Sequence, residues 1–393
     1  MKKLFVFVLF CISLISVKAI DINSKSGIMY NLNDDTIIYE KDSNSKLQIA
    51  SLTKIMTSII AIENANLDDI VTIKYQAFNG LDGYALAGFK VGDKVTIRDL
   101  LYGLMLPSGA ECGNMLAITI SDSYDDFVKL MNNKVDELKL ENTHFDNVIG
   151  MDSDNNYSTA YDLSIILKYA LNNDIFKEIY TSSSYTTTNG LKLSRTINRL
   201  ASGADLSLIK GNKTGHTDKA GYCLTSISNI DDIDFLIVTL GSKDAFDYVE
   251  DHNSLYNYFK DNYSYKYILN KDKLLTSIPI KNGKLKELNI YSDKEIKKYL
   301  SNDINVNDIK YEYSGIDIIT KKVKLNDKLG TINIKYKDEI LDSFDIYLTE
   351  KIEYKMELYI KIIIISIPLI IFILYIKKKK RKKINKYKRI IKK

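Results

Sequence analysis

A serine and a lysine stand three residues apart at the start of an apolar run, at Ser51 and Lys54. Residues 52–60 carry apolar side chains at helical spacing, which predicts a core helix with Ser51 in its first turn and Lys54 on the same face. A serine hydroxyl is a poor nucleophile at its free pKa, and a neutral lysine in a dry pocket can accept its proton. The pair therefore predicts a nucleophile and its base. The alternative is an ordinary helix start with an exposed lysine, because this spacing recurs in a lysine-rich chain.

Two further stretches place reactive side chains where regular structure is interrupted. Pro107 and Gly109 break a predicted helix around Ser108, so that its hydroxyl points away from the regular packing. The alternative role of Ser108 is a cap of the next helix. Lys213-Thr214-Gly215 precedes a predicted strand at 220–227, and a glycine there lets a ligand lie close against strand backbone. The alternative is a hairpin edge that carries a solvated lysine.

The elements that must position these residues are strands at both ends of a domain and helices in its middle. Residues 21–261 are long enough for one large domain with its own core. We expect strands at 26–32, 36–40, 220–227 and 234–241, and helices that begin near 51, 95, 112, 158 and 248. Ser158 or Thr159 would cap the fourth helix. Residues 273–348 lack long helical runs and include segments of period two, which predicts a small, mostly β second domain.

Both ends of the chain have the composition of membrane-related segments. Two lysines precede an apolar run at 4–17, followed by a cleavage site of small residues, which predicts a signal peptide at 1–19. An uncleaved anchor is the alternative. At the other end, an almost wholly apolar stretch predicts a membrane span at 356–376, and a soluble core helix is the alternative. The basic tail at 377–393 would lie in the cytoplasm and the rest of the chain outside the cell.

The formal net charge of +5 does not describe the exported part. The tail holds twelve Lys or Arg, the leader holds three, and neither holds an acid, so that removing both from +5 leaves −10 for positions 20–376. The excess basic residues would face anionic lipid headgroups, and we expect no nucleic-acid partner. Beyond the leader, Cys112 and Cys223 allow one disulfide or two buried free thiols. With three histidines and no clustered cysteines, we expect no metal and no cofactor.

The motifs, in this order on an exported and anchored chain, resemble those of the D-alanyl-D-alanine carboxypeptidases, the low-molecular-mass penicillin-binding proteins. The matching segments are Ser51-Leu52-Thr53-Lys54, Pro107-Ser108-Gly109, Tyr157-Ser158-Thr159-Ala160-Tyr161-Asp162, Lys213-Thr214-Gly215-His216-Thr217 and Ala220-Gly221-Tyr222-Cys223. The resemblance implies an α/β catalytic domain of the serine β-lactamase and DD-peptidase type at 20–262. Its five-stranded, mainly antiparallel sheet would have helices on both faces and a helical lobe. A β-rich domain would follow at 263–351.

The resemblance also implies three catalytic residues. Ser51 would attack the peptide carbonyl between two D-alanines and become an acyl-ester, while Lys54 takes its proton. Ser108 would relay a proton to the leaving amine, together with Lys54. Water would then release the shortened stem peptide.

A second group of residues would bind the substrate by the same resemblance. Lys213 would meet the terminal carboxylate, with a hydrogen bond from Thr214 or Thr217. Gly215 would let the substrate lie against the strand. The backbone N–H groups of His216 and the nucleophilic serine would form the oxyanion hole.

Two positions depart from the family's pattern. The second motif usually reads Ser-x-Asn, and its third position here is Ala110. That asparagine normally holds a substrate carbonyl and contacts the lysine base, so that we expect its absence to change the rate, deacylation or substrate range. Asn114 lies one helical turn further on and is not expected to replace it. Ile149 stands where relatives often carry a histidine, and it is given no role.

The expected function is a serine carboxypeptidase that trims peptidoglycan stem peptides and is acylated by β-lactams. It would be held in the cell membrane by one span, with the catalytic region outside. One alternative is a penicillin-binding or wall-binding protein that has lost turnover, as Ala110 suggests. Another is a β-lactamase, although the chain lacks a Glu-x-x-Leu-Asn motif that supplies the deacylating base in one such class.

Overall fold

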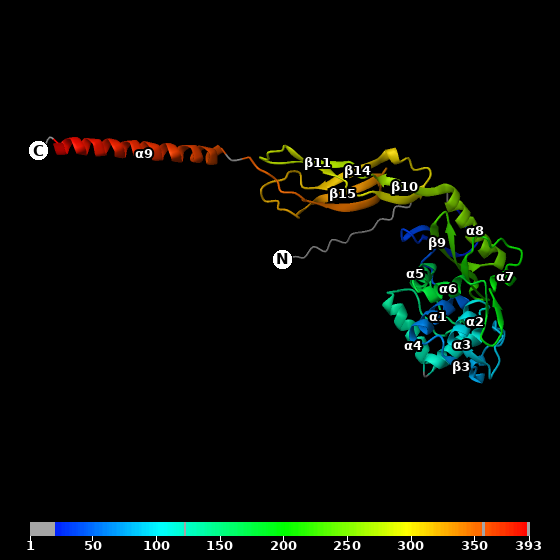
Figure 1. The fold of residues 1–393 in the computed structure, drawn as a ribbon. Helices are drawn as coiled ribbons and strands as arrows, with labels where there is room; N and C mark the ends of the chain where they lie inside the picture. Colours follow the sequence, from blue (N-terminus) through cyan, green and yellow to red (C-terminus); the bar gives the residue numbers. More distant parts are fainter. Residues whose placement is uncertain (1–19, 122, 356–357, 391–393) are drawn as a thin grey trace. The chain divides into compact units, whose positions relative to one another are not determined.

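The computed structural model describes residues 20–121, 123–355 and 358–390 (Figure 1). The predicted leader at 1–19 and the last three residues of the tail lie outside the described residues. The chain forms two compact units, with the boundary between Ser264 and Tyr265. Each unit has a hydrophobic core of its own.

The first unit contains a five-stranded antiparallel sheet in the order β2-β1-β9-β8-β7. The strands are β1 (Ser26–Asn31), β2 (Thr36–Lys41), β7 (Gly211–Thr217), β8 (Gly221–Ile230) and β9 (Ile233–Ser242). Every residue of β1 and all but one of β9 are buried, as expected for strands covered on both faces. The predicted sheet is confirmed, and β7 forms one of its edges.

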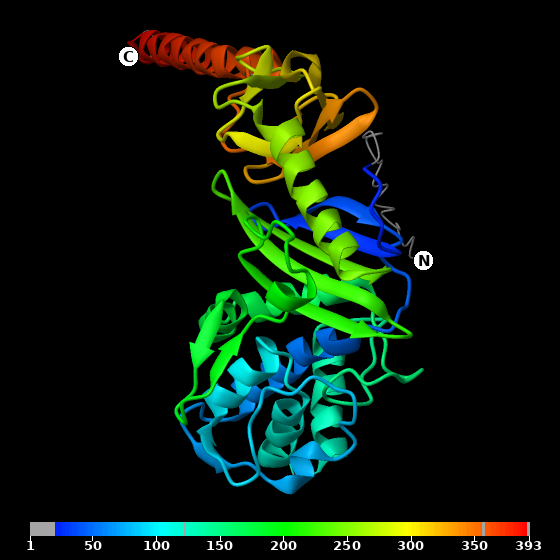
Figure 2. The ribbon, with the colours of Figure 1, turned by 90° about the vertical axis from the view of Figure 1, so that its right-hand side faces the viewer.

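Helices cover both faces of this sheet. The last helix of the unit, α8 (Ala245–Asn262), packs against β8 and β9, whereas α5 (Ala160–Leu171) packs against β1 and β9 from the opposite face (Figures 1 and 2). The Thr159 hydroxyl accepts a hydrogen bond from the Asp162 amide at 3.0 Å, so that Thr159 caps α5. Asp244 caps α8 in the same way, through the amides of residues 246 and 247.

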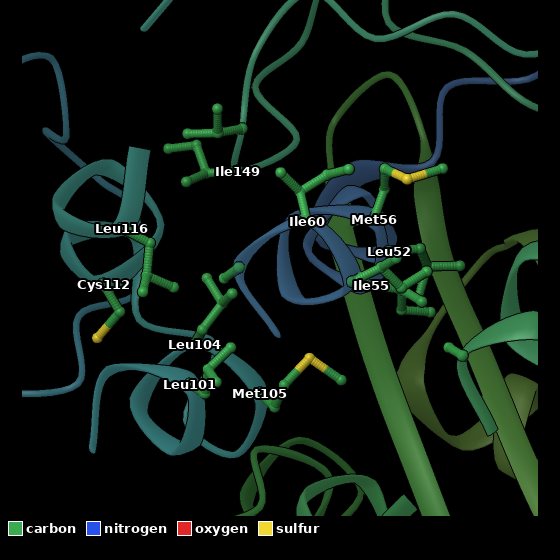
Figure 3. Close-up of a cluster of buried hydrophobic side chains, with 14 of the residues drawn as sticks. Leu52, Ile55, Met56, Ile60, Leu101, Leu104, Met105, Cys112, Leu116 and Ile149 are labelled. Carbon is green, nitrogen blue, oxygen red and sulfur yellow. The ribbon is translucent and has the colours of Figure 1, made fainter. Parts of the chain in front are cut away.

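The helical lobe is built around α1 (Thr53–Asn64), which is buried along most of its length. The other helices of the lobe are α2 (Ile97–Met105), α3 (Ala110–Ile120), α4 (Tyr124–Glu137) and α6 (Asp174–Thr181). Figure 3 shows apolar side chains of α1, α2 and α3 converging on one another, among them Ile55, Leu104 and Leu116. Each such side chain contributes about 1.5–3 kcal/mol when fully buried. This packing fixes the start of α1.

Short elements connect the larger ones. They are η1 (Ala50–Leu52), η2 (Tyr75–Phe78), α7 (Ile197–Leu200), the hairpin of β3 (Ile70–Thr72) with β4 (Lys94–Thr96), and the hairpin of β5 (Ser184–Thr186) with β6 (Lys192–Ser194). The predicted helix at Ser51 begins two residues later than expected, because Ser51 lies in the 3₁₀ turn η1. Ala50 has φ +45°, a left-handed conformation that a right-handed helix cannot include.

The second unit consists mainly of β-strands, as predicted. They are β10 (Tyr263–Leu269), β11 (Leu274–Pro279), β12 (Glu287–Tyr291), β13 (Ile296–Ser301), β14 (Ile309–Gly315), β15 (Lys328–Tyr336) and β16 (Glu339–Tyr347), with a short turn at η3 (Val306–Asp308). β14, β15 and β16 form a three-stranded sheet, and two pairs of strands complete the unit. Ile332 and Ile334 of β15 are fully buried in its core, so that alternate residues face inward.

The C-terminal helix α9 runs from Leu358 to Ile390 and includes Pro368. Among the described residues it holds the one stretch that is long and apolar enough to cross a membrane, Ile360–Lys382, in which 18 successive residues have a mean hydropathy of 2.4. The large apolar side chains at 362–376 are exposed, as a lipid-facing helix requires.

Candidate active site

The sequence places Ser51 and Lys54 one turn apart, and the structure brings their side chains into contact. Lys54 Nζ lies 2.9 Å from Ser51 Oγ. The Lys54 side chain extends from α1 into the interior and is only 1% exposed, whereas Ser51 is half-buried at the start of the helix. Gly150 makes this turn possible, because a Cβ atom there would lie 1.9 Å from the Ala50 carbonyl oxygen. The serine is therefore accessible while its lysine neighbour is dry.

Ser108 joins the two residues from the break between α2 and α3. It has φ +66°, which turns it out of the helical path between Pro107 and Gly109. Its hydroxyl lies 3.2 Å from Lys54 Nζ, and its carbonyl oxygen accepts a hydrogen bond from the same ammonium group at 2.9 Å. The cap of α3 is Gly109, without a side-chain hydrogen bond. The alternative that Ser108 caps this helix is therefore wrong.

Lys213 reaches the same hydroxyl from the edge strand β7. Its Nζ donates to Ser108 Oγ at 2.9 Å and to the carbonyl oxygen of Thr214 at 2.8 Å. The side chain is 1% exposed. The alternative of a solvated lysine on a hairpin edge is therefore wrong. One set of hydrogen bonds joins the side chains of all three motifs.

β7 lies directly against the turn that carries Ser51. A Cβ atom on Gly215 would lie 3.0 Å from the Ile49 carbonyl oxygen and 3.1 Å from the Ser51 amide nitrogen. Glycine suits this position because any side chain would press against the backbone of the turn. β7 and the turn that carries Ser51 are therefore in direct contact.

The remaining predicted binding residues continue along β7. Thr214 is buried, whereas His216 is exposed and its ring lies 4.0 Å from the ring of Tyr222 on β8. Thr217 is half-buried at the end of the strand, and its hydroxyl accepts a hydrogen bond from the Ala220 amide at 3.1 Å. The structure thus places the predicted residues from 213 to 217 on one strand beside Ser51.

Burial changes the acid–base behaviour of both lysines. It lowers the pKa of Lys54 to about 7, while the negative charge of Glu111 acts in the opposite direction. The pKa of Lys213 is well below its ordinary value, first because of burial and then because of the positive charge of Lys54. A substantial fraction of Lys54 is therefore an uncharged amine near neutral pH, as a general base must be.

Glu111 is a buried acid beside this site that the sequence analysis missed. It is 0% exposed in the first turn of α3, and its Oε1 accepts hydrogen bonds from the amides of Ala87 and Gly88 at 2.7 and 3.0 Å. Among the described residues, its buried Oε2 has no hydrogen-bond partner. Burial raises the pKa of this carboxyl group. The only signal in the sequence was an acid three residues after Ser108, at the start of a helix.

Ala110 and Ile149, the two positions that depart from the family's pattern, are buried in the helical lobe. Ala110 is 0% exposed and its amide donates to the Ala85 carbonyl oxygen at 2.8 Å. The Asn114 amide group donates to the carbonyl oxygen of Ala77 at 3.1 Å, and this contact directs it to η2. Ile149 is 1% exposed and lies among apolar side chains of the core (Figure 3).

Neither metal nor disulfide chemistry is visible in the described parts of the chain. Residues 20–121, 123–355 and 358–390 contain no group of three His, Cys, Asp or Glu side chains that could hold a metal ion. Cys112 and Cys223 are both buried free thiols. Of the two alternatives for this pair, the structure therefore selects the unpaired one.

Known proteins resemble this chain in sequence and in structure. A family model described as D-alanyl-D-alanine carboxypeptidase matches residues 14–244. The D-alanyl-D-alanine carboxypeptidase DacF of Bacillus subtilis is 27% identical over 325 residues, 81% of this chain and 83% of that protein. The Streptomyces K15 DD-transpeptidase structure matches with a TM-score of 0.57 and 31% identity, over 62% of this chain and 98% of that one. The carboxypeptidase DacD of Francisella tularensis shares the fold, with a TM-score of 0.69 and 23% identity over 86% of this chain and 95% of that one.

Proposed function

The chain belongs to the D-alanyl-D-alanine carboxypeptidase family, and we propose that Ser51, Lys54, Ser108 and Lys213 carry out its reaction. The protein is a serine-type D-alanyl-D-alanine carboxypeptidase, a hydrolase and a penicillin-binding protein. Its substrate is the stem peptide of peptidoglycan. The observation that supports these residue roles is the set of hydrogen bonds that runs from Ser51 through Lys54 and Ser108 to Lys213.

Acylation begins with the uncharged amine of Lys54, which takes the proton of the Ser51 hydroxyl. The serine oxygen then forms a bond to the carbonyl carbon between the two D-alanines. The amides of Ser51 and His216 stabilise the oxyanion that develops on the carbonyl oxygen. Ser108 lies between the two lysines, so that it can pass a proton to the departing nitrogen as the C–N bond breaks. D-Alanine leaves as the neutral amine or its ammonium form.

Deacylation repeats the proton transfer, with water as the nucleophile in place of Ser51. Lys54, again uncharged, takes a proton from a water molecule that attacks the ester carbonyl. The ester bond breaks, Ser51 regains its proton, and the shortened stem peptide is released. The same lysine therefore serves as the base in both half-reactions.

Residues of β7 provide the specificity for a substrate with a free C-terminal carboxylate. In its charged form, Lys213 pairs with the carboxylate, which stabilises that form once the substrate is bound. Thr214 or Thr217 adds a hydrogen bond, and Gly215 allows the substrate backbone to lie beside the strand. A peptide that ends in an amide would lose this ion pair.

The same nucleophile explains inhibition by β-lactams. Their strained amide carbonyl takes the place of the D-alanyl carbonyl and forms an ester with Ser51. Because Ala110 lacks the amide group that relatives place near the base, a protein that is acylated but does not turn over is the second candidate. Turnover of a peptide substrate separates the two.

The ends of the chain supply a location for this reaction. We assign export to the leader at 1–19 and membrane anchoring to the apolar part of α9, with the β-rich unit at 263–351 outside the cell. The basic tail at 377–393 would stay in the cytoplasm, where anionic lipid is the nearer partner. The catalytic unit, at 20–262, would then face the wall.

The residue roles can be tested by locating the penicillin ester. Purified full-length protein is incubated with benzylpenicillin, digested, and mapped by mass spectrometry. The account expects the added mass on the peptide that contains Ser51, and no adduct in the Ser51→Ala variant. An adduct that remains in this variant would overturn the assignment of the nucleophile.

A further inference from the structure

A second cavity lies in the catalytic unit, away from the catalytic residues. It has a volume of about 550 Å³, within the range of roughly 300–1,000 Å³ that is usual for ligand sites. It lies between α5, α6 and the end of β8, and its polar lining includes Lys168, Lys177, Lys210, Asn172, Ser228 and Asn229. The site described above contains none of these residues.

Three lysines and two acids line this cavity. Asp35 forms an ion pair with Lys168, whereas Asp234 accepts a hydrogen bond from the neutral Asn229 amide group at 2.7 Å and keeps its negative charge. Among the described residues, the Lys210 ammonium group donates to the Ser207 carbonyl oxygen at 3.1 Å, and neither Lys210 nor Lys177 has an ion pair. The lining therefore carries a net charge of +1, and these two lysines are available to an anionic ligand.

β8 directs alternate side chains to opposite faces of the sheet. Ser226 bonds His252 and Tyr256 of α8, so Ser228, two residues later, also faces α8, and its hydroxyl does not point into the cavity. Asn172 and Asn229 offer donors and acceptors at the rim.

The cavity is also connected to the catalytic strand. Lys210 pairs with β8 through its amide and precedes Lys213 by three residues, about 10 Å along an extended strand. The guanidinium group of Arg195 donates to the carbonyl oxygens of Lys210 and Thr181, and both of these residues line the cavity. A polymer that enters the active site could therefore also place a segment in this cavity.

We propose that this cavity binds a carboxylate-bearing segment of a second peptidoglycan stem peptide while a first one occupies the active site. The inference rests on the proposed function, because it takes peptidoglycan as the substrate. The ammonium groups of Lys177 and Lys210 would pair with the carboxylates, and the amide groups of Asn172 and Asn229 would hydrogen-bond the peptide backbone. The exported part has a net charge of −10, so that a local positive site helps it to hold a polymer that carries many acidic groups.

The test compares binding to the polymer with turnover of a short peptide. Full-length protein in detergent carries Lys177→Glu with Lys210→Glu, and Lys94→Glu, an exposed lysine on β4, is the matched control. Binding to insoluble peptidoglycan is measured by sedimentation in a Ser51→Ala background. We expect the dissociation constant of the double variant to rise roughly tenfold, from the loss of two ion pairs and the added repulsion. D-Alanine release from a short soluble peptide should stay the same when Ser51 is intact.

Three results would overturn the proposal. The first is equal binding by the double variant and the Lys94→Glu control. The second is the same loss of binding on glycan strands from which the stem peptides have been removed. The third is tighter retention by a phosphate-bearing wall polymer than by peptidoglycan, abolished by the same charge reversals. If the unaltered protein fails to release D-alanine, the proposed function fails, but the binding series can still be interpreted.

Discussion

Lys54 connects the chemistry of this site with its packing at the level of single residues. Its amine contacts two serine hydroxyls and one carbonyl oxygen, and the whole side chain is dry. The charged form loses its hydration there, which lowers the pKa to about 7. The burial that would make a charged lysine costly in a core therefore favours the uncharged amine that we propose as the base.

The pH dependence follows from that pKa. Below about 7, Lys54 is mainly protonated and cannot take the proton of Ser51; above it, the free amine predominates. We expect kcat/KM for D-alanine release to rise with pH and to level off above this value. Steady-state rates measured across the acidic and neutral range test the prediction. A rate that does not change through this range would show that another group is the base.

Glu111 provides a second test of the same electrostatics. Its negative charge raises the pKa of Lys54, and Gln keeps an oxygen that can accept from the amides of Ala87 and Gly88. The Glu111→Gln variant should therefore shift the acidic limb of the pH profile to lower pH. Glu111→Asp, which keeps the charge, is the control and should shift it less. Identical limbs in all three proteins would exclude this role.

The effect of Ala110 on turnover can be measured directly by substitution. An asparagine there would supply the amide group that relatives place near the substrate carbonyl and the lysine. If its absence limits the reaction, Ala110→Asn should raise kcat. Because Ala110 is fully buried, the larger side chain should also lower stability by about 1–3 kcal/mol. Steady-state kinetics and thermal unfolding are measured together, and an unchanged kcat in a folded variant would refute the idea.

The sequence could predict Ser51, Lys54 and Lys213 as candidates because their residue types and spacing carry the signal. It could not predict Glu111, whose importance comes from contacts with residues more than twenty positions away. Nor could it decide whether Ser108 was a cap, since that depends on the left-handed conformation of its backbone. Chemistry that depends on distant partners appears only in the folded chain.

At the level of elements, the site is formed where the edge strand β7 meets the turn before α1. The two elements touch at Gly215, where a Cβ atom would lie 3.0 Å from the backbone of that turn. Gly215→Ala should push the strand away from Ser51 and lower the acylation rate by about tenfold or more. Stopped-flow measurement of penicillin acylation tests this. Gly190→Ala, at a position with open space around it but φ +86°, controls for backbone strain.

Periodicity predicted the helix that carries Lys54, but not the turn that carries Ser51. The apolar spacing of α1 follows from its place in the core, which a local pattern can reveal. The 3₁₀ turn depends on φ +45° at Ala50 and on close packing against Gly150, which no local pattern shows. Similarly, Thr159 could be distinguished from Ser158 as the cap of α5 only by its hydrogen bond to Asp162.

For the whole molecule, the account requires the catalytic unit and the basic tail to lie on opposite sides of a membrane. A stretch with a mean hydropathy of 2.4, followed by a lysine-rich block, supports this arrangement. Protease added to intact cells without their outer wall should remove the catalytic unit and leave a small fragment that contains the tail. An epitope added after residue 393 would remain attached to that fragment and identify it on an immunoblot. Protection of the catalytic unit would contradict the proposed orientation.

The central claim is that Ser51 performs D-alanyl-D-alanine hydrolysis in this chain despite Ala110. The most direct measurement is D-alanine release from a peptide that ends in D-Ala-D-Ala, by the full-length protein and by its Ser51→Ala variant. The account predicts clear release by the unaltered protein and a loss of at least about a thousandfold in the variant. No release from the unaltered protein, while it still forms an ester with penicillin, would contradict the account and leave a penicillin-binding protein without turnover.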